Sequence, residues 1–176
     1  PIEVWKLAVK SKGGKLYSVD CFYDSGSQIE FAVNTTAAKL LRELDIIDEP
    51  VTCFGPQIRV TNYSNSNMGC LELVMALELV FPALDSKDLI GVRQTATMFT
   101  ADISQTPRIV VGRGFKKKLC AKEISEQVML IEKEGKKGTL EICESEEKLD
   151  SSLKLIDGDK IHHFTEKEIK EVLLKM

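Results

Sequence analysis

The stretch Phe22-Tyr23-Asp24-Ser25-Gly26-Ser27 carries the strongest structural signal in the sequence. A carboxylate comes at the end of an apolar strand and is followed at once by a hydroxyl, a glycine and a second hydroxyl. Gly26 lets another segment of backbone approach closely, and the hydroxyls of Ser25 and Ser27 can hold the turn or the carboxylate by hydrogen bonds. Asp-Ser-Gly is also common in ordinary turns. The stretch therefore predicts either a plain turn or a functional carboxylate at Asp24.

The residues on both sides of this stretch predict a mainly β fold. The segment Ser11–Gly14 is a hairpin-type turn, and Val51–Phe54 with Gln57–Tyr63 predicts a second hairpin whose turn lies near Gly55. Runs of alternating or continuous apolar residues indicate the other strands, which are Val4–Val9, Lys15–Tyr23, Gln28–Val33, Cys70–Phe81, Leu89–Val92, Ala96–Phe99, Arg108–Val111 and Thr139–Cys143.

Three segments predict helices between and after these strands. Asn34-Thr35-Thr36 caps a short helix that runs to Leu44, with apolar residues on one face. The helix-forming residues of Lys116–Lys133 predict a second helix, which Gly135 ends. Thr165-Glu166-Lys167-Glu168 matches a capping box and opens a final helix. The fold class is therefore mainly β with short helices and a C-terminal α/β extension.

Composition limits the class of protein. The chain has 176 residues, 43% hydrophobic and 29% charged, which is enough to form one well-packed core. With a net charge of −3, no nucleic-acid partner is expected. No apolar run approaches the roughly 20 residues that a membrane span needs, and the first residues lack a secretory pattern. The five cysteines are scattered, so reduced thiols and a cytoplasmic location are expected.

The charged residues are unevenly distributed along the chain. Residues 116–176 hold 13 lysines and 14 acidic residues. This change in composition predicts a first domain at residues 1–118 and a charged C-terminal extension, mixed helix and strand, at residues 119–176.

The sequence offers few other candidate sites. His162 and His163 are the only histidines and lack ligands at metal spacing, so no metal site is predicted. Asp157-Gly158-Asp159 lies in the charged tail and is interpreted as a surface turn rather than a second catalytic segment.

A second segment narrows the interpretation of the stretch around Asp24. It is Ile109-Val110-Val111-Gly112-Arg113-Gly114-Phe115. Together the two segments resemble the retropepsin family, the aspartic proteases of retroviruses and LTR retrotransposons, and are most like those of the Pao/BEL type. In that family an apolar strand ends in Asp-Thr/Ser-Gly, and a later apolar-Gly-Arg segment threads behind the catalytic loop. The resemblance covers roughly Val4 to Phe115. One departure is Gln28, which stands where relatives often carry an acid that pairs with the arginine of the Gly-Arg segment.

The resemblance implies a retropepsin-like closed β-barrel, the acid protease fold, with catalytic residues Asp24, Ser25 and Gly26. It also implies substrate-binding roles for Ser27, Phe54, Gly55 and Gly112, with Gly55 in a mobile flap hairpin, and a structural role for Arg113. Hydrolysis of an amide by this route requires two carboxylates that share a proton, and the chain has one such motif. A homodimer that supplies Asp24 twice is therefore expected, with no metal or organic cofactor.

The expected activity is that of an aspartic endopeptidase that binds a polypeptide in extended conformation and processes a retroelement polyprotein, either free in the cytoplasm or inside retroelement particles. Two alternatives stay open at this point. The first is a catalytically silent retropepsin-fold module, derived from a retroelement, that dimerises or binds peptides. The second is a plain β-rich interaction domain in which Asp-Ser-Gly is a turn.

Overall fold

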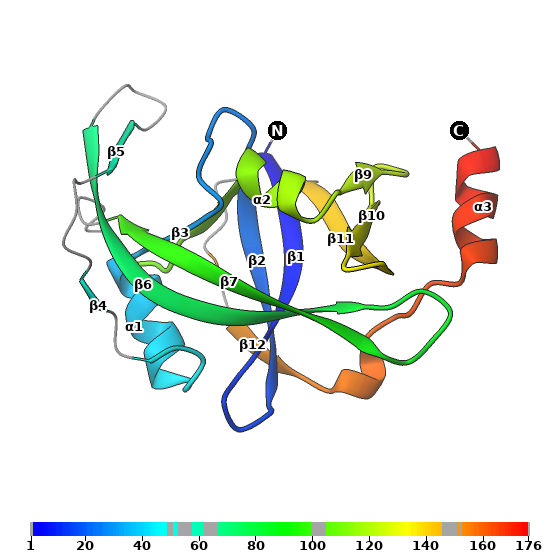
Figure 1. The fold of residues 1–176 in the computed structure, drawn as a ribbon, viewed down its shortest axis with the longest axis horizontal. Coiled ribbons are helices and arrows are strands. Elements are labelled where there is room, and N and C mark those ends of the chain that lie inside the picture. The colour runs from blue at the N-terminus through cyan, green and yellow to red at the C-terminus, as the bar shows by residue number, and fades with distance from the viewer. Residues whose placement is uncertain are drawn as a thin grey trace.

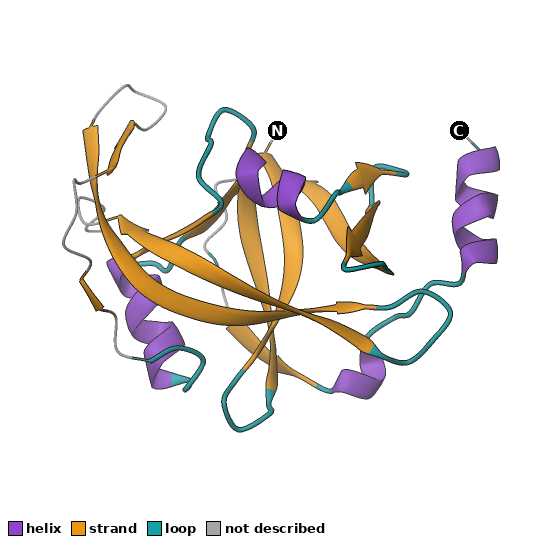
Figure 2. Cartoon of the chain, viewed as in Figure 1, coloured by secondary structure: helices purple, strands orange, loops and turns teal. Residues whose placement is uncertain are grey.

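The computed structural model describes residues 2–48, 51–52, 58–61, 67–99, 105–145, 151 and 153–175 and is mainly β (Figure 1 and Figure 2). Its helices are α1 (Thr35–Glu43), α2 (Arg113–Lys118), α3 (Glu166–Leu174) and the 3-10 turn η1 (Gly158–Lys160). Its strands are β1 (Ile2–Lys10), β2 (Leu16–Asp24), β3 (Phe31–Asn34), β4 (Val51–Thr52), β5 (Ile58–Thr61), β6 (Asn67–Pro82), β7 (Leu89–Phe99), β8 (Ile109–Gly112), β9 (Lys122–Glu123), β10 (Val128–Lys133), β11 (Lys136–Ser145) and β12 (Leu153–Ile156).

Six of the strands close into a barrel. Around the ring they are hydrogen-bonded in the order β1, β2, β8, β3, β7, β6 and back to β1. Beyond the ring, β11, β10 and β9 continue the sheet from β1, and β12 pairs with β2. The prediction of a mainly β fold with a closed barrel and short helices is confirmed.

The β1–β2 hairpin forms as its alternating sequence predicts. Trp5, Leu7 and Val9 of β1 are buried in the barrel core. In the turn, the Ser11 N–H donates to the Lys15 carbonyl (2.8 Å), and Gly14 adopts a left-handed φ of 86°. Strand alternation and turn chemistry therefore select the same register.

Helix α1 begins at a buried asparagine. The Oδ1 of Asn34 accepts hydrogen bonds from the N–H groups of Ala37 (2.8 Å) and Arg108 (3.0 Å), and its Nδ2 donates to the Thr106 carbonyl (2.8 Å). Asn34 is fully buried, so these bonds satisfy polar atoms that burial would otherwise leave without partners. The predicted helix and its cap are confirmed, and the same side chain ties α1 to the start of β8.

The region between α1 and β7 differs from the prediction. Both β4 and β5 pair with β6 rather than with each other, through Val51↔Val74 and Ile58↔Cys70. The hairpin is therefore β5–β6, and the prediction that Val51–Phe54 pairs with Gln57–Tyr63 was wrong. Gly55, where the turn was predicted, lies outside the described residues. Leu89–Val92 and Ala96–Phe99 belong to one strand, β7, because its long pairing with β6 continues through the polar residues between them.

The predicted helix at Lys116–Lys133 was also wrong. Helix α2 ends at Lys118 in a Schellman motif, in which the Cys120 N–H donates to the Lys117 carbonyl and the Ala121 N–H to the Lys116 carbonyl, both at 3.1 Å. Cys120 takes the left-handed conformation (φ 49°) that usually falls to glycine. The chain then forms β9 and β10, because burial of Val128, Met129 and Ile131 outweighs local helix propensity.

The part of the chain after α2 shares the barrel core. Its strand β11 pairs with the first half of β1, from Ile2↔Ser145 to Lys6↔Glu141. Ser151 is buried, and its Oγ accepts a hydrogen bond from the Ile109 N–H (3.1 Å) at the start of β8. The buried residues that this part contributes to the main hydrophobic cluster are Leu119, Met129, Ile131, Leu140 and Ile142. One continuous core thus spans the predicted boundary at residue 118.

A Met129→Ala substitution tests this shared core. Met129 is fully buried, so the variant is expected to lose about 3 kcal/mol of unfolding free energy through lost apolar burial and an unfilled cavity. Leu174→Ala is the matched control, since Leu174 is 86% exposed and its truncation is expected to be nearly neutral. Urea unfolding of both variants measures the difference, and equal midpoints would contradict a core that includes β10.

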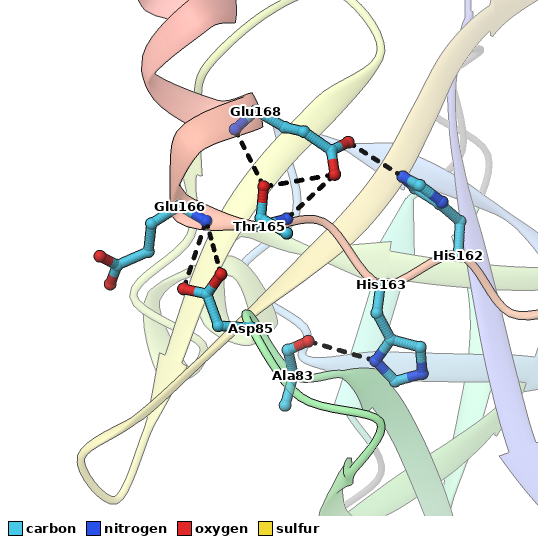
Figure 3. Close-up of polar contacts among 7 residues, drawn as sticks. All are labelled: Ala83, Asp85, His162, His163, Thr165, Glu166 and Glu168. Atoms are coloured by element: carbon cyan, nitrogen blue, oxygen red, sulfur yellow. Dashed lines mark hydrogen bonds and ion pairs between the residues drawn. The ribbon is translucent and has the colours of Figure 1, made fainter.

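Helix α3 is held against the turn between β6 and β7 (Figure 3). The capping box of Thr165 and Glu168 forms as predicted, and the Asp85 carboxylate also accepts a hydrogen bond from the Glu166 N–H (3.1 Å). His163 bonds the Ala83 carbonyl, and Ile169 packs in a small second cluster with Ile124 and Val128.

No helix formed by the described residues is long and apolar enough to cross a membrane.

Candidate active site

The two segments singled out in the sequence lie side by side. Strand β8 inserts between β2 and β3, pairing parallel with β2 and antiparallel with β3. The parallel register places Asp24, the last residue of β2, opposite Gly112, the last residue of β8. The loop of residues 25–30, which joins β2 to β3, therefore passes over the end of β8.

The loop itself orients the Asp24 carboxylate. The Gly26 N–H donates to Oδ1 of Asp24 (3.0 Å), and the Ser27 N–H donates to the Asp24 carbonyl (3.2 Å). The Ser27 Oγ accepts a hydrogen bond from the Ile29 N–H (3.2 Å). Asp24 is half-buried, whereas Ser25 and Gly26 are exposed. One carboxylate oxygen is thus fixed by a backbone amide at an accessible surface, which suits it to act as a base or as an acid on a bound molecule.

Gly112 and Gly114 allow β8 and α2 to lie directly against this loop. A Cβ added to Gly112 would stand 1.8 Å from the Ile29 carbonyl oxygen, and one added to Gly114 would stand 2.9 Å from the Gln28 carbonyl oxygen. The Gly112 N–H donates to the Glu30 carbonyl (3.1 Å). Gly112 is buried, so the structure places this predicted substrate-binding residue behind the loop.

Arg113 reaches the loop through its backbone. Its N–H donates to the Ser27 carbonyl (2.9 Å), while its side chain is exposed. Gln28, where the resemblance leads one to expect an acid, is exposed as well. In this chain a backbone hydrogen bond therefore joins the Gly-Arg segment to the loop.

An aromatic stack that the sequence analysis did not assign to the site supports the end of β2. The rings of Trp5 and Tyr23 stack with centroids 4.8 Å apart, and the Lys116 ammonium lies 5.3 Å from the Tyr23 ring centre. Burial and the nearby Glu3 raise the pKa of the Tyr23 hydroxyl, and the positive charge of Arg113 opposes this rise. Burial also raises the pKa of the Glu3 carboxyl, which accepts a hydrogen bond from Trp5 Nε1 (2.9 Å). The sequence could not have predicted this stack, because aromatic residues interleaved with charged residues are common in strands and helices.

The remaining predicted residues are more distant or undescribed. Phe54 and Gly55 lie outside the described residues. Asp157 and Asp159 are exposed in η1, where Asp157 accepts a hydrogen bond from the Asp159 N–H (3.0 Å), as expected for a surface turn. In the described part of the chain no group of three or more His, Cys, Asp or Glu side chains is arranged to hold a metal ion.

Comparisons with known proteins leave the family of the chain open. No protein-family model matches it, and searches of curated proteins and of solved structures found no match.

Proposed function

We propose that the protein is a retropepsin-like aspartic endopeptidase that cleaves peptide bonds with Asp24. The observation that carries this proposal is the position of Asp24 at the end of β2, with Oδ1 bound by the Gly26 amide and with Gly112 packed behind the loop. The resemblance of the two segments to the retropepsin family implied that they lie together, and the register between β2 and β8 supports this.

The reaction requires a second carboxylate, and we propose that a second copy of the chain supplies it. A dyad of two carboxylates that share one proton lets one remove a proton from water while the other protonates the carbonyl oxygen. As it loses that proton, the water oxygen forms a bond to the carbonyl carbon. The carboxyl that received the proton then donates it to the amide nitrogen, the other carboxylate takes a proton back from a hydroxyl of the tetrahedral intermediate, and the C–N bond breaks to release the amine. No metal or organic cofactor enters these steps.

The contact between the two copies is proposed to form around the loop of residues 25–30. Next to Asp24, strand β1 already pairs within the chain, with β2 on one edge and with β11 on the other. Strand β2 likewise pairs there with β1 and β8. Because these edges are occupied, the second copy is expected to dock through the exposed Ser25 and Gly26 rather than by adding a strand to β1.

The substrate is proposed to be a polypeptide bound in extended conformation. In Figure 1 the loop between β2 and β3 and the β5–β6 hairpin project from the same end of the barrel. We propose that an extended peptide binds at this end of the barrel through main-chain hydrogen bonds. The resemblance to retroelement enzymes makes a retroelement polyprotein in the cytoplasm the proposed source of this peptide.

A non-cleaving module that dimerises or binds peptides is the second candidate function. The observation that favours it is that Gln28 and Arg113 are both exposed. In the retropepsin family, which the two segments resemble, an acid often pairs with the arginine at these positions. The two functions predict different results when polypeptide cleavage and mass in solution are measured together.

Mixing of subunits tests the shared dyad directly. If each active site needs Asp24 from both copies, a threefold excess of Asp24→Asn subunits is expected to reduce the rate of a fixed amount of wild type to about one quarter. The measurement is the initial rate of peptide cleavage after subunits have exchanged, with substrate in excess. Exchange is verified from the mass of mixed dimers. An unchanged rate in mixed dimers would mean that each subunit cleaves alone.

A further inference from the structure

Gln94 is a fully buried polar side chain in the middle of β7. Burial of an amide is unfavourable unless its donors and acceptor find partners. Its Nε2 donates to the Glu30 Oε2 (2.9 Å) and to the Thr95 carbonyl (3.0 Å), and its Oε1 accepts from the Lys118 Nζ (2.8 Å). All its hydrogen-bonding groups are therefore used.

The two charged partners fix the orientation of the amide. A lysine ammonium can only donate and an ionised carboxylate can only accept, so Oε1 faces Lys118 and Nε2 faces Glu30. Both bonds involve a charged group and are for that reason stronger than bonds between neutral groups. Gln94 thus joins an anion to a cation through a side chain that is shielded from water.

These partners belong to the two elements that frame Asp24. Glu30 is the last residue of the loop that follows Asp24, and its carbonyl accepts the hydrogen bond of the Gly112 N–H. Its Cγ lies against Gly114. Lys118 is the last residue of α2, whose first turn packs on the same loop. Gln94, in the barrel wall, therefore binds both the loop of residues 25–30 and helix α2.

We infer that Gln94 is a positioning residue for Asp24, acting through Glu30 on the loop and through Lys118 on α2. This inference extends the proposed function, because it explains how the loop is held when cleavage occurs. It also makes a claim about the loop alone, since the order of residues 25–30 depends on Gln94 whether or not the protein cleaves peptides.

The Gln94→Glu variant is expected to change the pH dependence of cleavage, which the loss of a merely structural residue would not change. A protonated carboxyl at position 94 can still donate to Glu30, but an ionised one faces the Glu30 carboxylate and keeps only Lys118 as a partner. Relative to wild type, cleavage is expected to be within about twofold near pH 4.5 and about tenfold lower near pH 7. The matched control is Gln127→Glu, which makes the same change on an exposed residue outside the loop and outside α2 and is expected to follow the wild-type profile.

Amide hydrogen exchange separates this inference from the proposed function. In the full chain, the Gly26 and Ser27 amides are expected to exchange about tenfold faster near pH 7 in Gln94→Glu than in wild type, once intrinsic rates are corrected. If the wild type cleaves no peptide and the two proteins still differ in exchange, the protease proposal would be refuted. Gln94 would then remain the residue that supports the loop. Unchanged exchange at these amides would overturn the inference whatever the activity.

Glu30 variants keep the test valid if Gln94→Glu fails to fold. Glu30 is exposed, so Glu30→Ala is expected to fold normally and to accelerate exchange of the same amides about fivefold. Glu30→Gln retains an acceptor oxygen and is expected to restore most of the protection. Equal exchange in wild type, Glu30→Ala and Glu30→Gln would likewise overturn the inference.

Discussion

An Asp24→Asn variant is expected to lose at least about 10³-fold in the cleavage of an unfolded polypeptide while it keeps the wild-type fold. The amide cannot remove a proton from water, and in a symmetric dimer the change removes both carboxylates at once. The fold is expected to survive because an asparagine oxygen can still accept the Gly26 N–H, and because Asp24 is only half-buried. Cleavage is measured by mass spectrometry of peptide products from about pH 4 to 7.

Asp20→Asn is the matched control for this substitution. Asp20 lies on the same strand and the same face as Asp24, outside the loop, and its variant is expected to cleave at the wild-type rate. Mass in solution is measured for wild type and both variants. Cleavage by Asp24→Asn would assign the chemistry to another residue, whereas a wild-type dimer without cleavage at any pH would favour the binding module.

Features determined by neighbouring residues could be predicted from the sequence. The alternation of apolar residues predicted β1, and Ser11–Gly14 predicted the turn that follows it. Asn34 and Thr165 marked the starts of α1 and α3, because a helix cap is a contact between residues three positions apart. The neighbourhood of Asp24 and Gly112 was predictable only through the resemblance of their two segments to one family.

Features determined by distant contacts could not be predicted in the same way. Residues after Lys118 have the composition of a helix, yet Met129 and Ile131 are buried in the barrel core and form a strand. Both β4 and β5 align on β6, and no local signal distinguishes this arrangement from a hairpin at Gly55. Gln94 is one polar residue in an alternating strand, and its role depends on partners from a loop and a helix that lie far away in the sequence.

Among substitutions that add a single methyl group to the site, Gly112→Ala is expected to be the most destabilising. Gly112 has an extended backbone (φ −116°), so glycine is required there by space rather than by conformation. An added Cβ would stand 1.8 Å from the Ile29 carbonyl oxygen and 2.9 Å from the Ser27 carbonyl oxygen. Backbone atoms cannot rotate away as a side chain would, so the loop must move as a unit. We expect a loss of about 4 kcal/mol or more in the free energy of unfolding.

Two other glycines give a graded control for this effect. An added Cβ at Gly114 would lie 2.9 Å from the Gln28 carbonyl oxygen, and at Gly91 in β7 it would make an ordinary contact of 3.5 Å with the Glu78 side chain. Urea unfolding is expected to rank the losses as Gly112→Ala, then Gly114→Ala, then Gly91→Ala with little change. Because the loop carries Asp24, any Gly112→Ala protein that stays folded is also expected to lose cleavage. Equal stability of the Gly112 and Gly91 variants would mean that the loop does not rest on β8, and the geometry on which the Asp24 site depends would be refuted.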